Sequence, residues 1–140
     1  MPERQLCTFR LAGLHVGIDI GRVQEVLTDP DVRPVPLASA AVVGLINLRG
    51  QILTVVDGRA RLGLPPRESA GETHVILHEG GEAVSLVVDR DDEVIEIDPA
   101  DLEAVPSTVN ETIRAFTTGA YKLDDDLLLV LDVDLVLAAE

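Results

Sequence analysis

Short hydrophobic runs, separated by glycine, proline and acidic residues, follow one another along most of the chain. Valine, leucine and isoleucine dominate these runs, and β-branched side chains favour strands over helices. The runs cover residues 6–11, 14–20, 22–27, 40–48, 51–57, 73–78, 83–89, 93–97, 116–123 and 127–131. About ten short strands at this spacing predict an all-β barrel or sandwich.

The segments between the runs predict how the strands connect. Ala12-Gly13 predicts a hairpin turn in which Gly13 adopts a positive φ, and residues 79–82 predict a second hairpin. Residues 64–72 hold two prolines and a glycine and form the one convincing mid-chain loop. Asp98-Pro99 predicts a helical turn, with aspartate as the cap and proline at the first helical position. The tail, 132–140, is either a strand end or a short helix.

The run over 51–57 is the most strand-like segment. Its uninterrupted apolar residues predict a strand that is covered on both faces. The triplet Val55-Val56-Asp57 at its end recurs as Val87-Val88-Asp89, which suggests two similar halves but is too short to prove duplication.

Length and charge exclude several classes of protein. The 140 residues fit one compact unit, 1–140, or two small lobes that share a core. With 25 acidic and 11 basic residues the net charge is −14, which disfavours binding to nucleic acid or to an anionic membrane surface. The longest uncharged stretch near the centre, 34–48, is shorter than the roughly 18 residues that a membrane span needs. Residues 1–10 lack the apolar core of a signal peptide, so we expect a soluble, cytoplasmic protein without membrane insertion.

Candidate catalytic and metal-binding groups are few. His74 and His78 lie on one predicted strand, about 13 Å apart, too far to share a metal ion, and we expect them at a solvent edge or at the end of a barrel. The acidic clusters at 89–93 and 124–126 lack the glycine of a calcium loop and predict solvated turns. Cys7 is expected to be a small buried hydrophobe. No serine lies in a nucleophile elbow. The sequence therefore predicts no enzyme, no metal and no cofactor.

Residues 44–57 are unusual because an isolated Arg49 stands beside Gly50 between two apolar strands. Such an arginine needs either a partner or an exit to solvent. The alternative is an edge arginine whose stem covers apolar surface.

This run resembles the CheW-like family: Gly44, then the tetrapeptide N-L-R-G at 47–50, then an apolar strand that ends V-x-D at 55–57, then R-x-x-L-G at 59–63. Residues 17–20, 23–26, 83–89 and 119–132 resemble other strands of the family, so the similarity covers nearly the whole chain. The resemblance implies two intertwined five-stranded SH3-like barrels with one or two short helices and a groove between the barrels.

The resemblance also implies a function. It indicates a non-enzymatic adaptor that couples the cytoplasmic tip of a methyl-accepting chemoreceptor to the regulatory domain of a CheA-type histidine kinase, recruited to membrane receptor clusters. Val23, Glu25, Gly44, Arg49 and Val75 match positions of the receptor-binding groove, with Glu25 and Arg49 as a charged pair. Val35 and Leu37, in the proline-bracketed loop, are implied to face the kinase.

Two departures from the family pattern bear on these expectations. Gly58 replaces a common leucine and predicts a looser turn, and Val16 replaces a common aromatic residue and trims the core volume. Two other functions stay open: a CheW-like protein diverted to a non-flagellar chemosensory pathway that binds only kinase or only receptor, and a small β-barrel enzyme or ligand binder. The second would need a sizeable closed pocket with converging polar groups.

Overall fold

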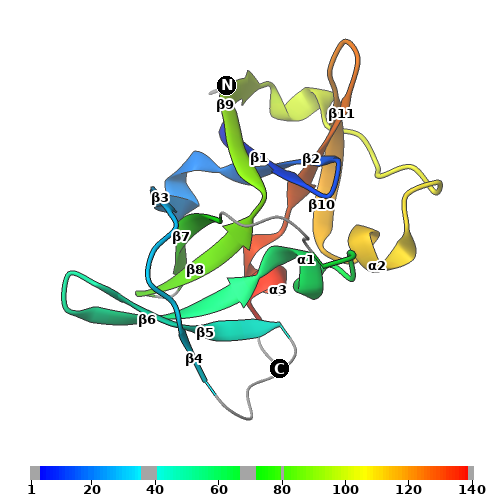
Figure 1. Ribbon diagram of the computed structural model, residues 1–140. Helices are drawn as coiled ribbons and strands as arrows, with labels where there is room; N and C mark the ends of the chain where they lie inside the picture. The colour runs from blue at the N-terminus through cyan, green and yellow to red at the C-terminus, as the bar shows by residue number, and fades with distance from the viewer. Residues whose placement is uncertain (1–3, 36–40, 67–71, 80, 139–140) are drawn as a thin grey trace.

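The computed structural model describes residues 4–35, 41–66, 72–79 and 81–138, and it places their strands in two sheets (Figure 1). Sheet A has the order β10-β11-β2-β1-β9, and sheet B has the order β3-β7-β8-β6-β5-β4. The strands of sheet A are β1 Arg4–Leu11, β2 Leu14–Asp19, β9 Arg90–Ile97, β10 Thr117–Lys122 and β11 Leu127–Leu131. Those of sheet B are β3 Val23–Thr28, β4 Arg33–Pro34, β5 Val42–Leu48, β6 Gln51–Asp57, β7 Thr73–Glu79 and β8 Glu82–Val88. The predicted all-β class is confirmed, with the two-residue β4 as a sixth strand of sheet B.

The described residues form five short helices, four between strands and one after the last strand, and a side chain caps the first turn of each. They are η1 Ile20–Arg22, α1 Gly58–Arg61, η2 Pro99–Asp101, α2 Glu111–Arg114 and α3 Val133–Leu137. The capping oxygens belong to Asp19, Asp57, Asp98, Asn110 and Asp132, each of which accepts a backbone N–H. Such caps satisfy donors that a helix start leaves unpaired. The helical turn predicted at Asp98-Pro99 is confirmed, and the tail forms a helix rather than a strand end.

Both predicted hairpins are present. Gly13 and Gly81 adopt φ of 87° and 88° in the β1–β2 and β7–β8 turns. Glycine adopts such values without the clash that a Cβ would cause. The mid-chain linker holds neither helix nor strand over 64–66, and residues 67–71 lie outside the described part.

One hydrophobic core joins the two sheets. Phe9 and Ile18 of sheet A pack in the same cluster as Leu77 and Leu86 of sheet B, and α3 adds Val136. Alternate residues of a strand point to opposite faces, so each sheet turns one face toward this shared core. A second cluster inside sheet B centres on Ile46, Leu53, Val55, Ile76 and Val87.

A partly buried ion pair fastens the sheets together at the end of β6. Arg59 donates to both carboxylate oxygens of Asp89 over 2.9 and 2.6 Å. The same carboxylate accepts the backbone N–H of Ala12, and the Asp89 N–H donates to the carbonyl of Arg10. Because Asp89 joins β8 to β9 while Ala12 lies in the β1–β2 turn, this residue connects sheet B with sheet A. The predicted solvated turn at 89–93 is therefore wrong: Asp89 fastens the sheets, and residues 90–93 belong to strand β9.

Three further expectations need correction. Strand β6 is covered on both faces only in its second half, because Ile52 is 59% exposed. The turn at Gly58 is tight rather than loose: it begins α1, and an added Cβ would lie 2.5 Å from the Val87 carbonyl oxygen. The two V-V-D segments do not mark two halves, since β6 and β8 lie side by side and parallel in one sheet.

Candidate functional site

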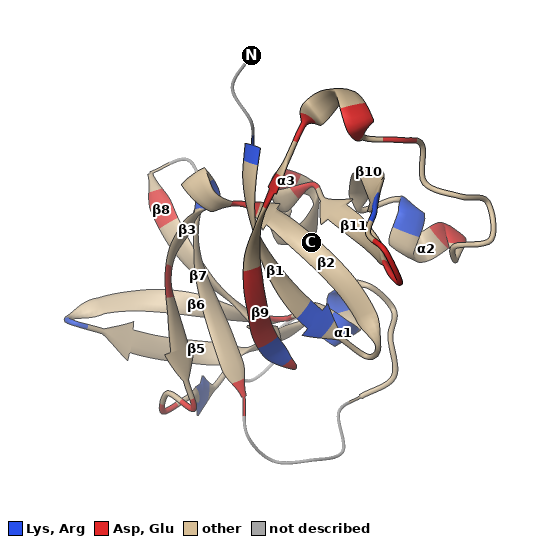
Figure 2. Ribbon diagram, turned by 90° about the horizontal axis from the view of Figure 1, so that it is seen from above, with Lys and Arg blue, Asp and Glu red and all other residues tan. Residues whose placement is uncertain are grey.

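Arg49 lies at the tip of the β5–β6 hairpin, where the chain reverses. Its φ is 51°, and that of Gly50 is 88°. Positive φ values at both central residues define a turn that favours asparagine and glycine, so an arginine in the first position costs conformational energy. The Asn47 side chain accepts the Gly50 N–H over 2.9 Å and supports the turn. The arginine thus projects from the end of the hairpin, which is basic at its tip in Figure 2.

Glu25 of β3 is the partner of Arg49. The two side chains form an ion pair, with a second contact of 3.5 Å between Arg49 Nη1 and Glu25 Oε1. The Arg49 side chain is 67% exposed and that of Glu25 is 27% exposed. The hydrogen bond from Arg49 lowers the pKa of Glu25, and the same bond raises the pKa of Arg49. The snorkelling alternative therefore does not describe Arg49, which is paired and open to solvent.

Two large hydrophobic side chains lie exposed close to this pair along the chain. Val26 follows Glu25 and is 40% exposed, and Ile52 is the second residue of β6, the strand after the Arg49 turn. Val26 pairs in register with Val75, and Ile52 shares a face of β6 with Val56; both of these partners are buried in the shared core. Val26 and Ile52 therefore lie at the margins of the face that sheet B turns toward sheet A. Sequence reasoning assigned neither residue to the site, and it missed Ile52 because it took the run at 51–57 to be covered throughout.

The structure places the three other predicted groove residues differently. Val23, at the start of β3, is half-buried against the shared core. Val75 has no exposed surface, so its assignment to a groove open to a partner is wrong. Gly44 is buried too, and a Cβ there would collide with the Arg33 carbonyl oxygen of neighbouring β4. The lack of a side chain at Gly44 therefore allows β4 to lie close to β5 and does not make room for a partner.

The predicted kinase-facing residues are only partly accounted for. Val35 follows directly after β4 and is half-buried. Leu37 lies outside the described residues.

The other candidate groups are built into the framework. His74 is fully buried and hydrogen-bonded, with 2.8 Å from its Nδ1 to Ser85 Oγ and 3.0 Å from its Nε2 to Glu72 Oε1. The expected solvent-edge position is therefore wrong for His74, although His78 is exposed. Burial raises the pKa of the Cys7 thiol, which opposes formation of a nucleophilic thiolate.

No group of three metal-ligating side chains comes together among the described residues. Within the same part of the chain no helix is long and apolar enough to cross a membrane. The described hollows have volumes of about 320 to 570 Å³ and open to solvent, unlike the closed pocket that the ligand-binder hypothesis requires.

Comparison with known proteins gives a consistent result. The family model described as "CheW-like domain" matches residues 5–140. The chain is 28% identical over 138 residues to the chemotaxis protein CheW of Rhizobium meliloti, and the match covers 98% of this chain and 89% of that protein. It is 32% identical over 136 residues to the chemotaxis protein CheW of Treponema pallidum, with coverage of 92% and 79%.

A solved structure gives the same answer for the fold. The crystal structure of the scaffolding protein TtCheW from Thermoanaerobacter tengcongensis superimposes with a TM-score of 0.88 and 30% identity, covering 99% of this chain and 95% of that one. The SH3-like architecture that the resemblance implied is confirmed by this likeness. The chain belongs to the CheW-like family of chemotaxis coupling adaptors.

Proposed function

We propose that this protein joins the cytoplasmic tip of a methyl-accepting chemoreceptor to the regulatory domain of a CheA-type histidine kinase, and that the Glu25–Arg49 pair contacts the receptor. The observation that carries the proposal is the conformation of Arg49. A turn that favours glycine or asparagine instead holds a long, exposed, charged side chain, and strained positions of this kind concentrate at functional sites.

The surroundings of the pair suit a helical partner. Val26 and Ile52 are exposed apolar side chains that follow the charged residues closely along the chain. Amphipathic helices are commonly bound by apolar surface rimmed by a few charges. A chemoreceptor tip is a helical hairpin in this family's mechanism, so a sheet that exposes both a charged pair and aliphatic side chains fits it. We assign Glu25, Arg49, Val26 and Ile52 to the receptor surface.

The kinase surface is assigned to the segment after β4. Val35 is half-buried there, and Leu37 follows two residues later in the sequence. Catalysis belongs to the kinase, and this chain supplies geometry only. Its place is therefore in the cytoplasm, at clusters of membrane receptors.

The test measures binding to two purified partners separately: a receptor cytoplasmic fragment and a kinase regulatory domain. Arg49→Ala and Glu25→Ala are each expected to abolish receptor binding. Kinase binding should stay within about twofold of that of the unchanged chain, because charges outside the kinase interface alter the affinity for the kinase little. Arg90→Ala is the matched control, since Arg90 is also an exposed arginine that pairs with a carboxylate, that of Asp92 on the same strand.

Each outcome has a definite meaning. Unchanged receptor binding in both variants would refute the site assignment. Binding of the unchanged chain to only one of the two partners would support the diverted, non-flagellar alternative in place of coupling.

We further propose that residues 1–140 act as one unit. The shared core supports this, because neither sheet can bury its inner face alone. Thermal unfolding should then give coincident transitions by far-ultraviolet circular dichroism and by NMR signals from each sheet. Two separated transitions would contradict the proposal.

A further inference from the structure

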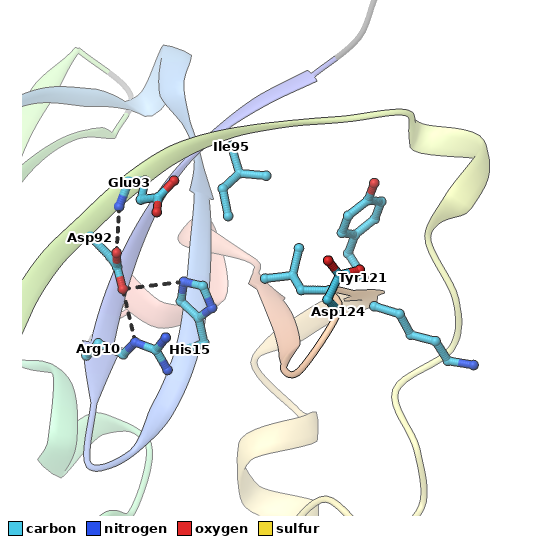
Figure 3. A pocket seen from close by; sticks show the side chains of 9 residues that line it. Arg10, His15, Asp92, Glu93, Ile95, Tyr121 and Asp124 are labelled. Carbon is cyan, nitrogen blue, oxygen red and sulfur yellow. Dashed lines mark hydrogen bonds and ion pairs between the residues drawn. The ribbon is translucent and has the colours of Figure 1, made fainter.

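Several charged residues of sheet A pair with one another. In the hollow of about 440 Å³ beside β9, Arg10 lies 3.1 Å from Asp92, and His15 lies 3.9 Å from the same carboxylate (Figure 3). The other ring nitrogen of His15 lies 3.1 Å from Asp126. Because Arg10, His15 and Asp92 belong to β1, β2 and β9, their charges are used within the sheet to join neighbouring strands.

The tip of the β5–β6 hairpin instead presents its charge to solvent, and its loop has an unusual sequence. Leu48 and Gln51 are paired in register, so Arg49 and Gly50 alone form the loop. The φ values of the two loop residues are 51° and 88°, as in a type I′ turn. Asparagine, aspartate or glycine usually occupies the first position of this turn, and an arginine there adopts a left-handed conformation at an energetic cost. Another contact must therefore favour this form of the turn.

Asn47 provides such a contact. The hydrogen bond of a β-turn joins its first residue to its fourth and leaves the N–H of the third, here Gly50, without a partner in the turn. The side-chain oxygen of Asn47 accepts this N–H over 2.9 Å. Asn47 is exposed and lies opposite Ile52, which is exposed too, so the asparagine side chain does not help to fill the core. Its contribution is to the turn.

The form of the turn decides where Arg49 points. The other two-residue loops do not keep its present conformation, because a type II′ turn needs glycine in the first position and a type I turn gives that position a negative φ. Glu25 lies on β3, which is separated from β6 by β7 and β8 in sheet B. The ion pair between Arg49 and Glu25 therefore spans strands that are not neighbours, and it forms only if the arginine leaves the turn toward β3.

We propose that Asn47 is a positioning residue for the receptor contact: its hydrogen bond to Gly50 holds the turn in the form in which Arg49 faces Glu25. Asn47 acts through the direction of the arginine side chain and not through a contact of its own, which presupposes the receptor role proposed above for the Glu25–Arg49 pair.

The test compares Asn47→Ala with Asn47→Ser, which differ only in a hydroxyl oxygen that can accept the Gly50 N–H. Asn47→Ala is expected to bind a receptor cytoplasmic fragment about fivefold more weakly, because the net contribution of one hydrogen bond shifts the equilibrium between turn forms by roughly that factor. Asn47→Ser should recover part of the affinity, since a serine hydroxyl holds such turns more weakly than asparagine. The affinity for the kinase regulatory domain should remain unchanged in both variants.

Two NMR measurements on the free chain follow the turn directly. The nuclear Overhauser effect between the amide and Hα protons of Arg49 is strong when φ is positive, and it should weaken in Asn47→Ala. The hydrogen bond from Arg49 lowers the pKa of Glu25, so this pKa should rise in Asn47→Ala and return part of the way in Asn47→Ser. A loss of overall stability without a change of the turn would move neither quantity.

Gln51→Ala is the matched control. Gln51 is also an exposed amide next to the turn, but its side chain makes no hydrogen bond with the described residues. An equal loss of receptor affinity in this control, or an unchanged receptor affinity or Glu25 pKa in Asn47→Ala, would overturn the proposal. If Arg49→Ala also leaves receptor binding unchanged, the proposed function fails together with it; if only Asn47→Ala does, the receptor site stands and Asn47 has no positioning role.

Discussion

The two ends of strand β6 each carry an arginine–carboxylate pair, and the two pairs differ in their surroundings. At the start of the strand, Arg49 is 67% exposed and meets Glu25 across open surface. Just beyond its end, Arg59 is 17% exposed and donates two hydrogen bonds to Asp89 and one to the Pro65 carbonyl. One pair is free to change partners and the other is not. An arginine paired with a carboxylate is therefore open to a partner at one end of the strand and part of the framework at the other.

The glycines beside the two pairs differ in the same way. Gly50 has nothing within 4 Å of where a Cβ would stand, so only its positive φ requires glycine. Gly58 does not have a positive φ, but a Cβ there would collide with the Val87 carbonyl oxygen. Substitutions at the two ends should therefore separate stability from binding.

The largest effect is expected for Gly58→Ala. A Cβ at 2.5 Å from a backbone oxygen forces β6 and β8 apart, and overpacking of this kind costs about 2 to 3 kcal/mol. Urea unfolding measures the free energy of unfolding. A loss no larger than that of Gly50→Ala would contradict the close approach of the two strands.

Arg59→Ala should follow, with a loss of about 2 kcal/mol, because it leaves the partly buried Asp89 carboxylate short of two hydrogen bonds. Arg59→Lys retains the charge but not the two-pronged geometry and should recover only part of the loss. Both are measured by urea unfolding, and an unchanged midpoint for Arg59→Ala would show that the pair does not fasten the sheets.

Gly50→Ala should cost about 1 kcal/mol, the penalty for a Cβ in a left-handed conformation without any clash. The same unfolding experiment measures it, and receptor binding should weaken in parallel because the turn presents Arg49. Full stability with full receptor binding would mean that the turn geometry is unimportant.

The smallest effect on stability is expected for Arg49→Ala, whose unfolding midpoint at neutral pH should not change measurably because exposed pairs contribute little. Its clearest signature is the Glu25 pKa, which should rise toward the ordinary glutamate value when the hydrogen bond is lost. The lowered pKa means that the contribution of the pair is present above the ordinary glutamate pKa and is lost as the pH falls through the lowered one. A carboxyl-detected NMR titration follows this change, and an unaltered pKa would show that the pair does not form in solution.

Local features of the fold could be predicted from the sequence. The Gly13 turn and the Asp98 cap each depend on a few neighbouring residues, and both are present. The burial of Val75 could not be predicted in this way, because it depends on sheet A packing over sheet B. The role of Asp89 depends likewise on Arg59, 30 residues away, and on Ala12 in the other sheet.

The candidate site could likewise be predicted from the sequence only in part. Arg49 was singled out because an arginine beside glycine between apolar strands is unusual in itself. Its pairing with Glu25 joins residues 24 positions apart, and only the family resemblance pointed to it. Ile52 was missed because an apolar run does not show which of its residues are covered by the rest of the fold.

The order of strands in the two sheets has a consequence for synthesis of the chain. Residues 23–88 supply all the strands of sheet B, while sheet A combines β1 and β2 with β9, β10 and β11. Because the N-terminus emerges first from the ribosome, the β1–β2 hairpin must wait for two of its partners, and an isolated hairpin is marginally stable. Sheet B can assemble meanwhile, with Leu77 and Leu86 still uncovered. Until β11 emerges, the nascent protein presents this apolar face to chaperones and to other chains.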